Sequence, residues 1–161
     1  MKYFIFAALL FVMLPASAQL KATARCPEML VDILDGHINR VSPKFTAGEI
    51  KKVFPCYTSE IEKTDSMACA GVFIKDKGLS FFTDRNYIEI TDVYKGKMEP
   101  AVMGAPRGSL FKFLGNASIK DDSLDAFITR YGTLILYYNT TGKVNKIQMS
   151  SRAADYIKLC N

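Results

Sequence analysis

From Cys69 onward, apolar residues alternate with polar ones in short runs, and turn sequences rich in Gly, Asn and Asp separate the runs. Alternation places successive side chains on opposite faces of a strand, so it predicts a half-buried antiparallel sheet. Three runs make a first meander and three more a second one. The predicted strands are Ala70–Lys75, Leu79–Thr83, Tyr87–Thr91, Ala126–Arg130, Leu134–Tyr138 and Val144–Met149.

Helical signals surround these strands. Apolar residues recur at helical spacing over Glu28–Val41, which predicts an amphipathic helix there. Thr46 and Glu49 form a capping box, so a second helix begins at this point and ends before Pro55. The other two predicted helices are Gly108–Leu114, which Gly115 stops, and Arg152–Leu159, which Ser150 or Ser151 caps.

The two halves of the chain repeat the same order of elements. Gly48–Phe54 and Gly108–Leu114 both open on glycine, and Phe73–Gly78 and Phe127–Gly132 both begin with Phe-Ile and end on a glycine at the same interval. We therefore expect an α+β fold of two tandem helix-then-meander units, about 42–92 and 105–149, that form one sheet packed against helices. The terminal helix follows at about 152–159. A chance likeness between two hairpins is the alternative.

The first eighteen residues have the features of a cleavable signal peptide. Lys2 precedes the apolar run Tyr3–Leu14, and the small residues Ala16-Ser17-Ala18 suit the cleaving peptidase. The apolar run is shorter than the roughly 20 residues that span a bilayer, so a retained anchor is the weaker alternative. We expect a mature single domain over 19–161, secreted or periplasmic, with no membrane insertion after cleavage.

Four cysteines follow the signal: Cys26, Cys56, Cys69 and Cys160. An even number in an exported chain predicts two disulfides. Of the three possible pairings we favour Cys56–Cys69, which closes a short loop, with Cys26–Cys160 joining the two ends of the domain. The spacing is not that of a zinc site, so we expect no metal and no other cofactor.

The charge of the chain is mildly basic. Lys2 is the only charged residue of the signal, so its loss lowers the formal net charge from +5 to +4. The basic residues are scattered as pairs along the chain and do not form a continuous stripe, so we expect no nucleic-acid partner. These pairs are Lys51-Lys52, Lys75/Lys77, Lys95/Lys97 and Lys143/Lys146.

Catalytic signals are weak. His37 is the only histidine and falls on the apolar side of the first predicted helix, so we expect a structural role for it. No serine or cysteine has the context of a nucleophile. Two acidic clusters leave open, as the alternative function, a small secreted hydrolase that uses carboxylates. The clusters are Glu60, Glu62 and Asp65, and Asp121, Asp122 and Asp125.

A binding face is the sharper hypothesis, because alternation divides the predicted sheet into two sides. One side is aliphatic and suits a core: Leu79, Phe81, Ile88, Ile90, Leu134, Leu136, Ile147 and Met149. The other mixes aromatic and polar residues, as protein interfaces do. We predict that Phe82, Tyr87, Ile135, Tyr137 and Lys146 contact a partner protein there. The alternative is that the terminal helix buries this side as a second core layer.

One segment also carries a family resemblance. Gly132–Ile147, with its pattern Gly-x-Leu-x-Leu-x-Tyr and then Gly-Lys-Val-x-x-Ile, resembles the unit of SmpA/OmlA-type outer-membrane assembly lipoproteins. Two such units in tandem, braced by disulfides, are similar to the β-lactamase inhibitory proteins. This chain lacks the lipid-bearing cysteine of the lipoproteins. The resemblance implies a non-catalytic protein-binding role, inhibitor-like or as an envelope adaptor, and it carries no catalytic residue over to this chain.

Overall fold

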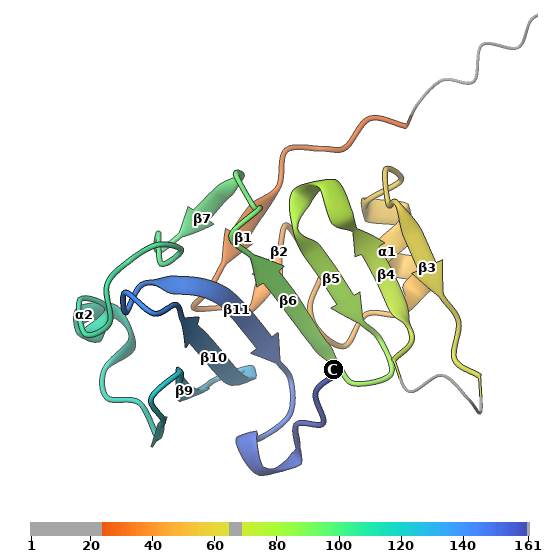
Figure 1. Ribbon diagram of the computed structural model, residues 1–161. Helices are drawn as coiled ribbons and strands as arrows, with labels where there is room; N and C mark the ends of the chain where they lie inside the picture. The colour runs from red at the N-terminus through yellow and green to blue at the C-terminus, as the bar shows by residue number, and fades with distance from the viewer. Residues whose placement is uncertain (1–23, 65–68, 161) are drawn as a thin grey trace, which may run out of the picture.

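The computed structural model describes residues 24–64 and 69–160, and the predicted signal peptide lies outside them (Figure 1). The described part is a mixed α+β structure, mostly sheet, with two disulfides. The helices are α1 (Ala47–Val53) and α2 (Phe111–Leu114), and short 3-10 turns lie at Lys75–Lys77 and Ala154–Tyr156. The strands are β1 (Leu30–Asp32), β2 (His37–Ile38), β3 (Ser59–Ile61), β4 (Gly71–Ile74), β5 (Leu79–Phe82), β6 (Tyr87–Thr91), β7 (Lys97–Glu99), β8 (Ile119–Lys120), β9 (Leu124–Thr129), β10 (Gly132–Tyr138) and β11 (Val144–Ser150).

Eight strands form one large antiparallel sheet in the order β3-β4-β5-β6-β11-β10-β9-β8. The six predicted strands are all present in it, within one or two residues of their predicted ends. The last strand of each meander pairs with the other, because β6 lies beside β11 with Ile88 opposite Met149. A small sheet, β2-β1-β7, completes the described architecture.

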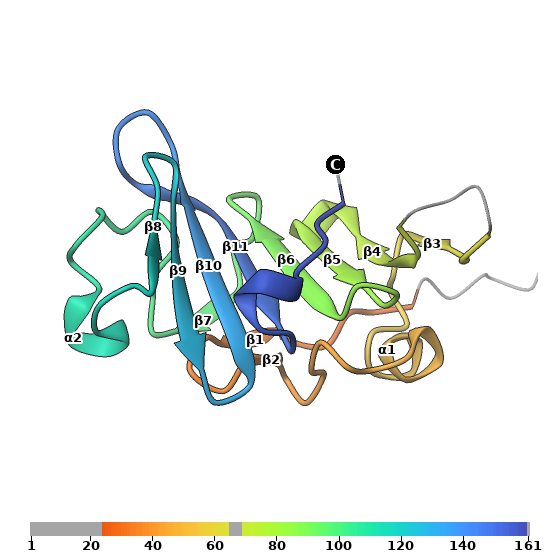
Figure 2. The ribbon, with the colours of Figure 1, turned by 90° about the horizontal axis from the view of Figure 1, so that it is seen from below.

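The large sheet separates two unlike layers. Figure 2 shows α1, β1 and β2 on one side of it and the terminal segment on the other. We call the side toward α1 the core face. Its residues are no more than 2% exposed: Leu79, Phe81, Ile88, Ile90, Leu134, Leu136, Ile147 and Met149. Phe54, which ends α1, stacks on Phe81 with ring centroids 5.6 Å apart, so the helix is fixed directly on this face.

Helix α1 forms for the predicted reason. The Thr46 hydroxyl accepts a hydrogen bond from the Glu49 amide, and the Glu49 carboxylate accepts one from the Thr46 amide at 2.8 Å. Both bonds satisfy amides that a helix start leaves unpaired. Gly115 ends α2 at a φ of +69°, a conformation that glycine adopts without strain, so the predicted stop is confirmed.

The predicted helix over Glu28–Val41 is wrong, because this segment holds β1 and β2. The Asp32 carboxylate accepts hydrogen bonds from the amides of Leu34 and Asp35, which closes a turn after β1. Gly36 follows at a φ of +69°, with the Tyr131 ring packed where a side chain would stand. The turn and the parallel pairing of β1 with β7 therefore replace the helix.

The favoured disulfide pairing is also wrong, since the bridges are Cys26–Cys56 and Cys69–Cys160. The β3–β4 register sets Ser59 opposite Phe73, which places Cys56 and Cys69 toward opposite ends of that hairpin. A strand rises about 3.3 Å per residue, so the two sulfurs are too far apart to bond.

Two further segments differ from expectation. The predicted terminal helix is a single 3-10 turn at Ala154–Tyr156, because the chain there is drawn out toward the Cys69–Cys160 bridge. The segment between β6 and α2, predicted to be irregular, includes β7. Its pairing partner β1 lies far away in the sequence, so no local pattern announces it. No helix among the described residues is long and apolar enough to cross a membrane.

Candidate functional site

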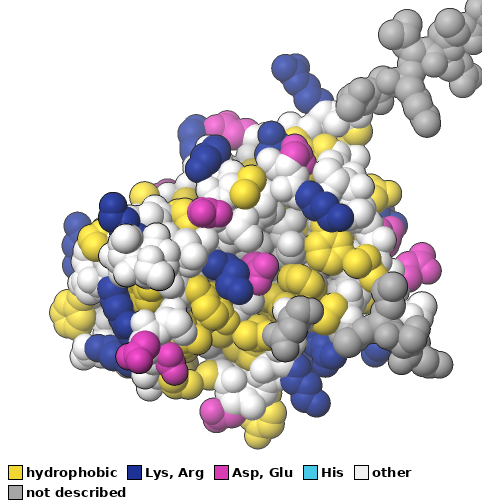
Figure 3. Space-filling view, viewed as in Figure 1, with side chains coloured by type: hydrophobic (Ala, Val, Ile, Leu, Met, Phe, Trp, Pro, Cys, Tyr) yellow, Lys and Arg dark blue, Asp and Glu magenta, His cyan; other side chains and the backbone are white. Residues whose placement is uncertain are grey.

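The side of the large sheet away from α1 is the predicted binding side, and we call it the open face. Strand register aligns its central residues in one row: Phe73, Ser80, Glu89, Gln148, Ile135 and Ala126. Figure 3 looks onto this face and shows hydrophobic side chains across its middle, with a basic and an acidic side chain meeting among them. Of the described chain, only the terminal segment crosses this side in Figure 2.

Three aromatic rings form one end of the open face. Phe82 stacks on Tyr87 with ring centroids 4.5 Å apart, and Phe73 meets Phe82 edge-on at 5.5 Å. Phe73 and Phe82 are partly exposed, whereas Tyr87 is buried. The rings hold one another in place, so the two exposed ones present contact area with little freedom left to lose.

A polar network lies next to these rings. The Gln148 amide donates to the Glu89 carboxylate at 2.8 Å, and the Tyr137 hydroxyl donates to the Gln148 carbonyl at 2.9 Å. The Lys146 ammonium lies 3.6 Å from the Glu89 carboxylate and 4.2 Å from the centre of the Tyr137 ring. Burial, and then the charge of Glu89, raise the pKa of Tyr137, so its hydroxyl keeps its proton. The network fixes Tyr137 and Lys146 in one orientation.

The structure places the five predicted contact residues on this one face, but it exposes only some of them. Phe82, Tyr137 and Lys146 are partly exposed. Tyr87 and Ile135 are 1% and 7% exposed, so neither offers much area for contact. Tyr87 accepts a hydrogen bond from the Cys160 amide at 3.0 Å, and burial raises its pKa to about 12. At this end the terminal segment therefore contacts Tyr87 through Cys160, but the predicted terminal helix that would bury this side is not formed.

Sequence reasoning missed several residues of the open face. Phe73 alternates with the buried Val72 and Ile74, so its own strand pattern contained the signal. Ile128 and Ile119, which are 76% and 46% exposed, share this face through the β8-β9-β10 register. That register was not visible in the sequence, because no local rule states which residue of β9 lies opposite Leu134.

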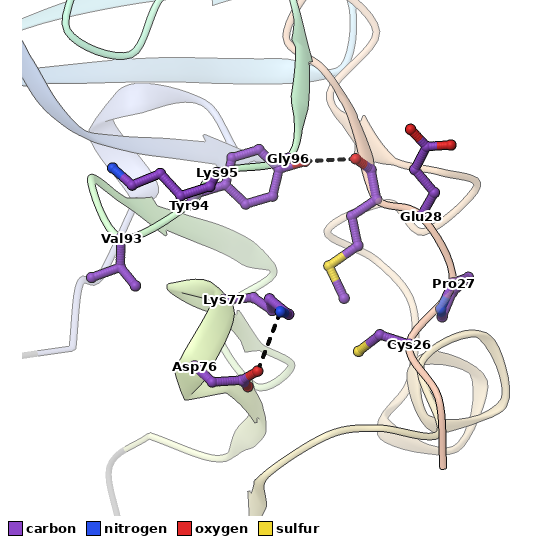
Figure 4. A pocket seen from close by; sticks show the side chains of 10 residues that line it. Cys26, Pro27, Glu28, Asp76, Lys77, Val93, Tyr94, Lys95 and Gly96 are labelled. Atoms are coloured by element: carbon purple, nitrogen blue, oxygen red, sulfur yellow. Dashed lines mark hydrogen bonds and ion pairs between the residues drawn. The ribbon is translucent and has the colours of Figure 1, made fainter. Parts of the chain in front are cut away.

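A cavity of about 350 Å³ lies elsewhere, between residues 26–29 and the loop after β6 (Figure 4). The Tyr94 hydroxyl lies within hydrogen-bonding distance of the carbonyls of Met29 and Lys97, at 2.8 and 2.9 Å, and so joins the two segments. The charged side chains on its wall are all exposed: Glu28, Asp76, Lys77 and Lys95. Its polar contacts brace the fold, and we assign it no chemistry.

Of the acidic residues that left hydrolysis open, the buried Asp125 and the partly exposed Glu60 have structural partners. Asp125 receives two hydrogen bonds from the Arg107 guanidinium, at 2.6 and 3.2 Å, and one from the Tyr138 hydroxyl at 2.8 Å. Glu60 pairs with Lys51 at 2.7 Å. Asp65 lies outside the described residues.

His37 is partly buried in β2, opposite Asp32, and not on a helix as expected. In the described ranges, no group of three or more His, Cys, Asp or Glu side chains is placed to hold a metal ion. In the comparisons with known proteins, no family model, no curated protein and no solved structure matches the chain.

Proposed function

We propose that the mature chain is a secreted or periplasmic, non-catalytic protein-binding module that recognises its partner through the open face. The observation that carries this proposal is the pair of partly exposed rings, Phe73 and Phe82, held by stacking beside a hydrogen-bonded polar network. Protein interfaces favour this combination, because rigid aromatic side chains supply large contact area at low entropic cost.

The disulfides support the compartment in this proposal. Two bridges are typical of proteins that fold outside the cytoplasm, where thiols are oxidised. The predicted signal peptide adds a route for export. Within that compartment the module acts as an inhibitor-like protein or as an envelope adaptor.

The tandem-unit hypothesis belongs to the same proposal. The strand order supports it, because β6 and β11, each the last strand of its meander, lie side by side at the centre of the sheet. A short helix precedes each meander, α1 before β3 and α2 before β8. Both meanders belong to one eight-stranded sheet, so the open face is continuous across the two units.

Partner capture with matched variants tests the proposal. The tagged mature protein is used to retain proteins from its native envelope or culture fluid, and Phe82→Ala and Tyr137→Ala are compared with Phe111→Ala. Phe111 lies on α2 and is 61% exposed, so it controls for the loss of any exposed ring. Truncation of a central aromatic contact costs about 2 kcal/mol of binding, roughly thirtyfold in affinity.

We expect Phe82→Ala and Tyr137→Ala to lose the retained protein while Phe111→Ala keeps it. The melting temperature of each variant is measured alongside, so that loss of fold is not mistaken for loss of binding. Equal retention by all three folded variants would show that the open face is not the binding site.

A further inference from the structure

The two disulfides occupy different environments. Cys26 and Cys56 pack against the cluster of buried core residues, so their bridge is part of the core side. The other bridge ties Cys160, at the end of the described chain, to Cys69, which precedes β4. This bridge holds the terminal segment, residues 151–160, across one end of the open face (Figure 1).

Hydrogen bonds anchor this terminal segment at its two ends. At the start, the Ser151 amide donates to the Asn86 carbonyl at 3.1 Å, and the Thr133 hydroxyl donates to the Arg152 carbonyl at 2.8 Å. At the finish, the Cys160 amide donates to the Tyr87 hydroxyl. Between these two ends, the backbone hydrogen bonds among the described residues join only residues of the 3-10 turn and its immediate neighbours, Ala153 and Ile157.

The terminal segment is weakly packed, since none of residues 151–160 is buried. Tyr156 is 72% exposed and Leu159 is 38% exposed, although both are large and apolar. Few buried contacts and an exposed backbone are the marks of a segment that opens locally before the rest of the protein does. The disulfide is therefore the main constraint on its last residues.

From these observations we propose that residues 151–160 are a covalently held strap over part of the binding face, and that reduction of Cys69–Cys160 releases the strap and uncovers Tyr87. The proposal rests on the proposed function, because it concerns access to the same face. Release would add the Tyr87 ring to the exposed pair Phe73 and Phe82, which enlarges the aromatic surface available to a partner protein.

The reductant is a dithiol. Its thiolate attacks one sulfur of the bridge, which breaks the Cys69–Cys160 bond and forms a mixed disulfide. The second thiol of the dithiol then attacks the dithiol's own sulfur in this mixed disulfide. The dithiol leaves as a cyclic disulfide, and the remaining protein cysteine is released as a thiol. Two electrons and two protons pass from the dithiol to the protein, which gains two thiols. The strap begins only after β11 ends at Ser150, so the sheet itself loses no strand when the strap leaves.

Nitration of Tyr87 by tetranitromethane, located by peptide mapping, tests the strap without any partner. The Cys69→Ser/Cys160→Ser double variant lacks the strap bridge, and the matched Cys26→Ser/Cys56→Ser variant lacks the other. We expect Tyr87 to be nitrated at least tenfold faster in the first variant and at the wild-type rate in the second. The wild-type protein in limiting dithiothreitol gives a second measurement: alkylation is expected at Cys69 and Cys160 before Cys26 and Cys56.

Protection of Tyr87 that persists without the bridge would overturn the strap, and so would reduction of Cys26–Cys56 first in the wild-type protein. Partner capture then separates the two proposals. Stronger retention by the strap-free variant supports regulation, and unchanged retention overturns it. Failure of the proposed function has a different signature, because Phe82→Ala would then retain the partner as well as the wild type does.

Discussion

On the core face, side chains from β5, β6, β10 and β11 are almost wholly buried and form an apolar layer with α1, β1 and β2. On the open face, the same four strands carry stacked rings and a charged, hydrogen-bonded network in which Gln148 is buried while Glu89, Tyr137 and Lys146 are partly exposed. The difference shows that different interactions stabilise the two faces. The core face depends on contact area, whereas the open face depends on pairs of specific partners, so substitutions on the two faces are expected to differ in kind.

The largest effect is expected from neighbouring phenylalanines that point to opposite faces. Phe81→Ala removes a buried ring that stacks on Phe54 and is expected to cost about 4 kcal/mol of unfolding free energy. Phe82→Ala removes a partly exposed ring and is expected to cost about half as much. Urea unfolding under oxidising conditions measures both. Equal losses would mean that the open face is a second core.

The next effect is expected at Asp125 in β9. This buried polar residue lies opposite Leu136, on a face that is otherwise apolar. Asp125→Asn weakens charge-assisted hydrogen bonds from Arg107 and Tyr138, so we expect a loss of about 2 kcal/mol. Asp122→Asn is the matched control, because the Asp122 side chain is exposed and lies just before β9. Thermal unfolding of both variants gives the difference, and a neutral Asp125→Asn would show that the edge is held by packing alone.

A smaller effect, which depends on pH, is expected at Tyr94 in the core. Burial raises the pKa of Tyr94 to about 12, above its ordinary 10, so the neutral phenol stabilises the fold fully below pH 10 and this stability is lost as the pH rises through 12. Tyr94→Phe removes the bridge to Met29 and Lys97 and is expected to cost roughly 1–2 kcal/mol at pH 7. Its unfolding free energy should then fall less steeply between pH 10 and 12 than that of the wild type, and an identical slope would contradict this role.

The smallest effect on stability belongs to the open-face network. Tyr137→Phe deletes only the hydrogen bond from a partly exposed hydroxyl to the buried Gln148, so we expect a loss of about 1 kcal/mol, the typical net value of one such bond. Retention of the partner is expected to fall more than stability does, because the ring loses its fixed orientation. Chemical unfolding and partner capture are compared on the same preparation. A large stability loss with unchanged retention would assign Tyr137 to the scaffold.

The strands and turns of the large sheet were predictable because their signals are local. Alternation along Leu79–Phe82 and Leu134–Tyr138 marks both the strand and its buried side, and the core residues Phe81 and Leu134 follow from it. The capping box of Thr46 and Glu49 likewise needs no distant contact. By contrast, Leu30 and Leu34 matched a helical stripe yet are exposed, because the turn at Asp32 and the pairing with β7 decide that segment.

The candidate site was only half predictable. The sequence determined which side chains share a face, since a pleated strand leaves alternation no choice, and it determined that four cysteines would pair. Tertiary structure alone decided which cysteines pair and which part of that face stays open. Both outcomes depend on contacts between residues far apart in the chain, as when the Cys69–Cys160 bridge draws the terminal segment over Tyr87 while Phe82 beside it remains accessible.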